Sequence, residues 1–131
     1  MGILDRFRKK EETKIQVETK TITELEQFLG DDRETFEALV NTIFLDPRKI
    51  QISMKDAAEN AKKFEKANDV VNARIMYEIA GGLAIYEGNV KKVVEYFSDC
   101  ERLQTDVKYP IIKNPDKAVA KAQEYYKKYL K

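Results

Sequence analysis

The stretch from residue 67 to residue 89, ANDVVNARIMYEIAGGLAIYEGN, constrains the fold of this chain more than any other. Turn-forming pairs bound it, with Asn68-Asp69 near its start and Gly88-Asn89 at its end. Between the two turns, small residues occupy positions where leucine would bury more surface. They are Ala73, Ala80, Gly81, Gly82 and Ala84. Small side chains let another backbone approach closely, so the stretch predicts helices packed tightly side by side.

Apolar residues at helical spacing predict further helices on both sides of this stretch. The predicted helical segments span residues 23–30, 32–45, 53–67, 70–87, 90–103 and 114–131. The first of these is only about two turns long. The connections between the central segments contain two or three residues, which forces neighbouring helices to run antiparallel. The predicted fold is therefore all-α, an antiparallel helical bundle of about five helices.

Two regions lie outside this helical pattern. Residues 106–113 hold Pro110 and are predicted to cross the surface between two helices. Residues 1–20 are predicted to form an N-terminal amphipathic segment and a linker, and residues 21–131 a single helical domain. The chain has no apolar run long enough for a membrane span, no cleavable signal and one cysteine, which together predict a cytoplasmic protein.

Charge is distributed unevenly along the chain, although the net charge is only +1. Residues 1–10 carry +3 and residues 108–131 carry +5, whereas residues 11–107 carry −7. Positive ends can attract anionic lipid, nucleic acid or an acidic partner, and they are equally consistent with solvated lysine-rich tails. The abundance of Lys and Glu suits a protein from a hot environment and also any exposed helical surface.

The residue types that carry most catalytic chemistry are missing. The sequence has no histidine and one cysteine, Cys100, which excludes Ser-His and Cys-His pairs and thiolate zinc sites. Cys100 falls on the apolar side of its helix, as a core residue would. Gly81-Gly82 lacks the spacing of a phosphate-binding loop. We therefore expect no enzymatic activity, no cofactor and no metal site.

Part of the chain resembles two families of helical interaction modules. Ala73, Tyr77 and Ala80, after the turn at Asn68-Asp69, have the spacing of the second helix of a tetratricopeptide repeat. The segments 64–69, 73–77 and 93–103 also resemble a MIT domain, a three-helix module that binds helical tails of membrane-remodelling proteins. Ala57 stands where the tetratricopeptide family has a large aromatic residue. A generic bundle, a tetratricopeptide-like module and a MIT-like module remain as alternatives.

Either resemblance implies that a partner helix or peptide binds in a groove between helices, with no chemistry involved. Aromatic residues contribute strongly to interfaces. The candidate partner-binding residues are therefore Tyr77, Tyr86, Tyr96 and Phe97. Some of these rings must belong to the core, and the spacing alone does not separate the two groups. The predicted function is a non-catalytic protein-protein interaction or scaffolding module.

The first ten residues are similar to the short amphipathic anchors of peripheral membrane proteins. Ile3, Leu4 and Phe7 lie on one side of a helix drawn through them, where they could contact a membrane. Arg6, Lys9 and Lys10 lie elsewhere and could contact anionic lipid. Binding by one copy is expected to be marginal, so stable attachment needs an oligomer or a membrane-bound partner.

The tyrosine- and lysine-rich end supports an alternative function in nucleic-acid association. Tyr125, Tyr126 and Tyr129 alternate with lysines, an arrangement that allows stacking on bases beside phosphate contacts. Helical spacing offers the simpler interpretation that Tyr125 and Tyr129 face the core while Tyr126 and the lysines are solvated. The acidic middle of the chain also argues against this alternative.

Overall fold

The structure is a computed structural model that describes residues 22–42 and 50–130. Residues 22–29 are helical and precede α2 (Arg33–Val40), α3 (Met54–Lys66), α4 (Val70–Glu87) and α5 (Val90–Leu103). A short 3₁₀ helix, η2 (Pro110–Ile112), leads into α6 (Pro115–Tyr129). The described residues contain no strand, and the all-α prediction of packed helices is confirmed.

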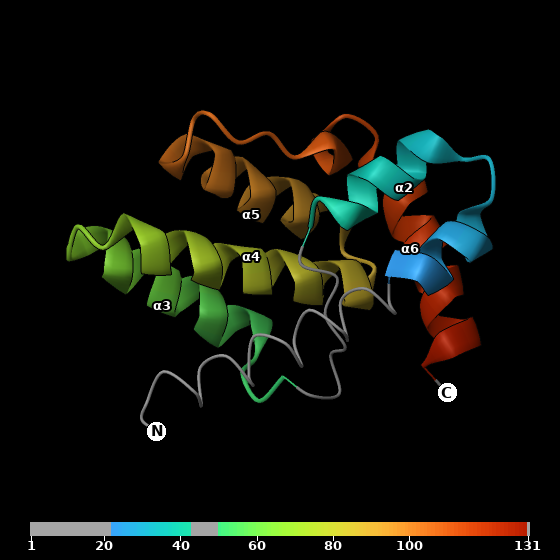
Figure 1. The fold of residues 1–131 in the computed structure, drawn as a ribbon. Helices are drawn as coiled ribbons and strands as arrows, with labels where there is room; N and C mark the ends of the chain where they lie inside the picture. The colour runs from blue at the N-terminus through green and yellow to red at the C-terminus, as the bar shows by residue number, and fades with distance from the viewer. Residues whose placement is uncertain (1–21, 43–49, 131) are drawn as a thin grey trace, which may run out of the picture.

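Helix α4 is the centre of the fold. It packs along α3 on one side and α5 on another, and Figure 1 shows the three helices side by side. The predicted turns make both connections. Asn68 adopts a positive φ of 58° before Asp69, which caps α4 by accepting from the Asn72 amide. Gly88 ends α4 in the left-handed region, and Asn89 then caps α5.

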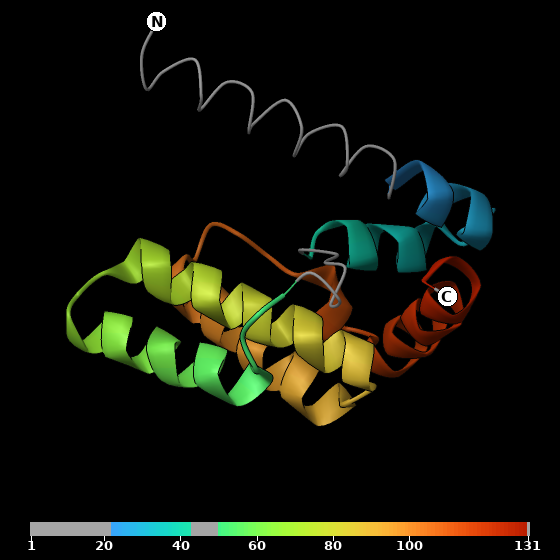
Figure 2. The same ribbon diagram turned by 90° about the horizontal axis from the view of Figure 1, so that it is seen from below.

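A second layer of helices covers the C-terminal end of α4. The helical segment 22–29 and α2 form a hairpin that lies beside α6 in both ribbon views (Figures 1 and 2). Phe28 packs its ring edge-on against Tyr125 and Tyr129, and the Tyr125 hydroxyl donates to Glu24. Gln123 of α6 donates from Nε2 to the carbonyl oxygens of Ile85 and Tyr86 at 2.6 and 2.5 Å. These contacts fix α6 at the C-terminal end of α4.

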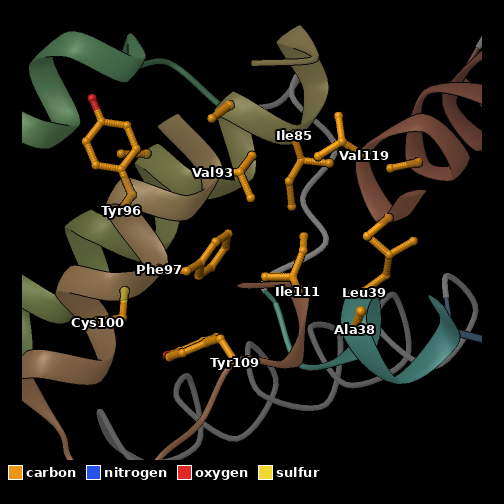
Figure 3. Packing of buried hydrophobic residues seen from close by; sticks show 14 of the residues in the cluster. Ala38, Leu39, Ile85, Val93, Tyr96, Phe97, Cys100, Tyr109, Ile111 and Val119 are labelled. Carbon is orange, nitrogen blue, oxygen red and sulfur yellow. The ribbon is translucent and has the colours of Figure 1, made fainter. Parts of the chain in front are cut away.

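One hydrophobic core joins these layers. Phe97 lies at its centre, and Figure 3 shows its ring facing Ile111, with Tyr109 and Cys100 nearby. A Cβ added at Gly81 would lie 2.6 Å from Phe97 Cε2, so this glycine leaves the space that the ring fills. Ala73, Ala80 and Ala84 are likewise completely buried. The small residues of α4 thus let α3 and α5 pack close to its backbone.

One boundary prediction is wrong. α2 ends at Val40 and does not continue through Asn41 and Thr42. The side chain of Asn41 donates to the Glu37 carbonyl, and the Thr42 hydroxyl donates to the Leu39 carbonyl, so side chains satisfy carbonyls at the end of the helix. The remaining predicted residues of this helix, 43–45, lie outside the described residues.

The segment predicted to cross the surface is also partly a core element. Tyr109 and Ile111 are buried, and Pro110 opens the 3₁₀ turn that directs Ile111 into the core. Tyr126, which was expected to be solvated, is buried and packs edge-on against Tyr86. Both errors have the same cause. The periodicity of a short segment does not show whether its apolar side chains reach a core that is formed by distant elements.

Candidate interaction face on the central helix

Helix α4 differs from the other described helices in how little charge it carries. Only three of its 18 residues are charged, namely Arg74, Glu78 and Glu87. Arg74 Nη1 lies 2.6 Å from Glu78 Oε1, so two of the three charges compensate each other along the same helix. The rest of the α4 surface therefore presents mainly apolar side chains.

Exposed apolar residues concentrate on this helix. Among residues 22–42 and 50–130, the large hydrophobic side chains that are exposed are Ile22, Val70, Val71, Ile75 and Tyr86, and four of these five belong to α4. Val71 is 64% exposed and Ile75 36%. Ile79 is half-buried at the next position of the same spacing. We name Val71, Ile75 and Ile79 the α4 face, because residues four apart lie one above another on a helix.

The structure sorts the four aromatic residues that the sequence proposed for partner binding. Tyr86 is 42% exposed at the C-terminal end of α4, where its ring contacts Tyr126. Tyr77, Tyr96 and Phe97 are buried between α4 and α5, and the rings of Tyr77 and Tyr96 stack on each other. These three rings are core residues and do not contribute to an exposed face. The aliphatic residues of the α4 face were not among the sequence candidates.

A polar cluster joins α4 to the segment before η2. Glu78 Oε1 accepts from Arg74 and from the Tyr109 hydroxyl, which ties the segment before η2 to α4. Burial and the bond to Glu78 both raise the pKa of Tyr109, so its hydroxyl keeps its proton at neutral pH. Nothing in the sequence pairs Glu78 with Tyr109, which lies 31 residues away.

A second polar cluster joins α3, α4 and α5, and it meets α4 at Tyr77, next to Glu78. Arg102 Nη2 of α5 lies 2.6 Å from Glu65 Oε1 of α3 and 3.2 Å from Asp99 Oδ1. The hydrogen bond from Arg102, followed by one from the Tyr77 hydroxyl, lowers the pKa of Glu65. The two clusters thus contact α4 between Arg74 and Glu78 and tie this part of the helix to α3, α5 and the segment before η2.

The one cysteine of the sequence lies beside Arg74 of the first cluster. Cys100 is completely buried and packs with Phe97, and burial raises the pKa of its thiol to about 12. Within the part of the chain that the structure describes, His, Cys, Asp and Glu side chains form no group of three that could hold a metal ion. The contacts of both clusters join side chains from different elements.

The structure describes the residues proposed for nucleic-acid contact but not those proposed for membrane contact. Tyr125 and Tyr126 are buried, and only Tyr129 of the three tyrosines remains half-exposed. Buried rings present no open surface for base stacking. Ile3, Leu4, Arg6, Phe7, Lys9 and Lys10 lie outside the described residues. Of the helices that the structure describes, none combines the length and apolarity needed to cross a membrane.

No protein-family model matches this chain, and neither a curated protein nor a solved structure matches it significantly.

Proposed function

We propose that this protein is a non-catalytic interaction module whose α4 face binds the apolar side of a partner helix. The observation that carries the proposal is the concentration of exposed apolar side chains on one nearly uncharged helix. An amphipathic helix is the natural complement of such a face, because its apolar residues repeat at the same spacing of three or four. The pairing of Arg74 with Glu78 keeps a free charge away from the contact.

The size of the face sets the strength that this contact can have. Complete burial of Val71 and Ile75 contributes on the order of 1–2 kcal/mol, because each side chain is already partly covered. That amount alone does not offset the free-energy cost of association. A partner must therefore also contact neighbouring residues, and Val70 and Tyr86 extend the apolar surface toward the two ends of α4. The proposed complex is a reversible one.

The test compares two changes of the same kind at different places. The variant Val71→Glu/Ile75→Glu places charges on the α4 face, whereas Ile22→Glu changes the one exposed large hydrophobic residue that lies off α4 in the described chain. Affinity capture from the native cells should recover a partner with the wild type and with Ile22→Glu, and lose it with the double variant. Circular dichroism checks that all three proteins are folded. Recovery of the same partner by the double variant would reject the α4 face as its binding site.

No observation on the described residues favours the nucleic-acid alternative, since Tyr125 and Tyr126 are buried. Attachment to an anionic membrane through residues 1–10 remains a second proposal that depends on their amphipathic sequence. It is compatible with partner binding at the α4 face, because the sequence predicts a linker over residues 11–20 between the two segments.

A further inference from the structure

A hollow of about 340 Å³ lies where α2, η2 and the start of α6 meet. This volume is at the lower end of the range for ligand pockets. Its lining includes Ala38 of α2, Pro110 of η2 and Ala118 of α6, all of them apolar. Ala38 and Ala118 are buried, so the apolar part of the lining is supplied by elements that are fixed in the core. The hollow is a separate feature from the α4 face, and the inference does not depend on the proposed function.

Two carboxylates line the hollow on the α2 side. Glu34 and Glu37 are three residues apart, which places them on the same side of the helix. Both are exposed, and within the described chain neither side chain forms an ion pair or a hydrogen bond. Two other carboxylates of α2 and its surroundings are paired, since Asp32 lies 3.3 Å from Lys117 and Glu26 lies 3.3 Å from Arg33. Unlike these two, Glu34 and Glu37 are free to contact a ligand in the hollow.

The charge of the lining favours a cationic occupant. Two of its charged residues are acidic, Glu34 and Glu37, and one is basic, Lys113. A ligand that fits must combine an apolar part, which lies on Ala38, Pro110 and Ala118, with a positive group near the two carboxylates. A long basic side chain has this construction, because its methylene stem is apolar and its end is charged. Arginine fits better than lysine, since a planar guanidinium can donate to two carboxylates at once.

We propose that this hollow binds the arginine side chain of a partner peptide. The methylene stem lies along the apolar lining, and the guanidinium donates to Glu34 and Glu37. Lys113 also lines the hollow and is exposed. Its ammonium repels a cationic ligand, so it weakens binding and lowers the affinity for a single arginine.

The test uses nuclear magnetic resonance titration of the full chain with acetyl-arginine N-methylamide. The control ligand is its neutral isostere, in which citrulline replaces arginine. Arginine should shift the amide signals of Ala38 and Ala118 with a saturable curve, and citrulline should bind at least about tenfold more weakly, because it lacks the charge-assisted bonds. The variant Glu34→Gln/Glu37→Gln should lose the preference for arginine. Glu59→Gln, at an exposed position of α3, should keep it.

A third variant tests the charge of the hollow without changing a residue of α2. Lys113→Ala should strengthen arginine binding, because it removes a like charge from the lining. Weaker arginine binding by Lys113→Ala would contradict the proposal and would indicate a ligand with an anionic group. Equal binding of arginine and citrulline, or arginine shifts that are absent or scattered over the molecule, would also overturn it.

Discussion

At the scale of single residues, the contact between Gly81 and Phe97 decides how closely α4 and α5 approach. The Phe97 ring is completely buried, and its centroid lies 5.2 Å from that of Tyr109. The ring therefore has a neighbour that limits its movement away from α4. The same contact explains why a central helix uses glycine despite its poor helix propensity.

Replacing Gly81 with alanine should destabilise the protein, by up to about 2 kcal/mol. The added Cβ would meet Phe97 Cε2 at 2.6 Å and Cζ at 2.7 Å, and overpacking of a core costs about 1–3 kcal/mol. This cost exceeds the gain of about 1 kcal/mol that alanine brings to a helix. Urea unfolding measures the difference. In a Phe97→Leu background the same change should cost less, and stabilisation of the wild-type background would contradict the account.

At the scale of elements, the polar cluster at one end of the bundle joins three helices through a few contacts. Glu65 belongs to α3, Tyr77 to α4, and Asp99 and Arg102 to α5. The salt bridge between Glu65 and Arg102 is partly open to solvent, with side-chain exposures of 27% and 52%. Solvent screening limits its contribution to at most about 1 kcal/mol. The cluster thus orients the helices more than it stabilises them.

This cluster predicts a specific dependence of stability on pH. Since the hydrogen bonds from Arg102 and Tyr77 lower the folded-state pKa of Glu65, its contribution is complete above the unfolded-state pKa of about 4.3. The contribution is lost as the pH falls through the folded-state pKa. Glu65→Gln should therefore be less stable than the wild type at pH 7, and the difference should shrink toward pH 3. Urea unfolding at both pH values measures it, with Glu59→Gln as the control. A difference that stays constant would contradict this role of Glu65.

The hairpins of α3, α4 and α5 could be predicted from sequence because each boundary has a local chemical cause. Asn68-Asp69 and Gly88-Asn89 supply the turn and the caps that end one helix and start the next. The burial of Tyr109 and Ile111 could not be predicted in this way. Their segment contains a proline and has no helical period, so its packing depends on contacts with residues far away in the sequence.

The candidate site was less predictable than the fold, for a reason that lies in α4 itself. A helix with apolar residues on every side gives no periodic signal of which side is covered. Tyr77 and Tyr86 therefore look equivalent in the sequence, although one is buried and the other is exposed. The distinction arises only from where α3, α5 and α6 pack.

At the scale of the whole molecule, much of the uneven charge is compensated between elements. Residues 22–42 carry a net charge of −5, and residues 113–130, with five basic and two acidic residues, carry +3. These regions pack together, with Lys117 paired to Asp32 and Lys128 5.7 Å from the centre of the Phe28 ring. The basic end thus meets an acidic partner within its own chain. The α4 face, in contrast, is the main apolar surface of the described chain that no contact within the chain covers.

Site-specific photo-crosslinking in the native cells tests the central claim most directly. A photoreactive amino acid replaces Val71 on the α4 face in one protein and Ile22, outside that face, in another. The account predicts that the Val71 position gives a discrete product whose crosslinked peptide belongs to an amphipathic helix of the partner. It predicts no such product from the Ile22 position. The absence of any product from Val71, or the same product from both positions, would contradict the claim that the α4 face binds a partner helix.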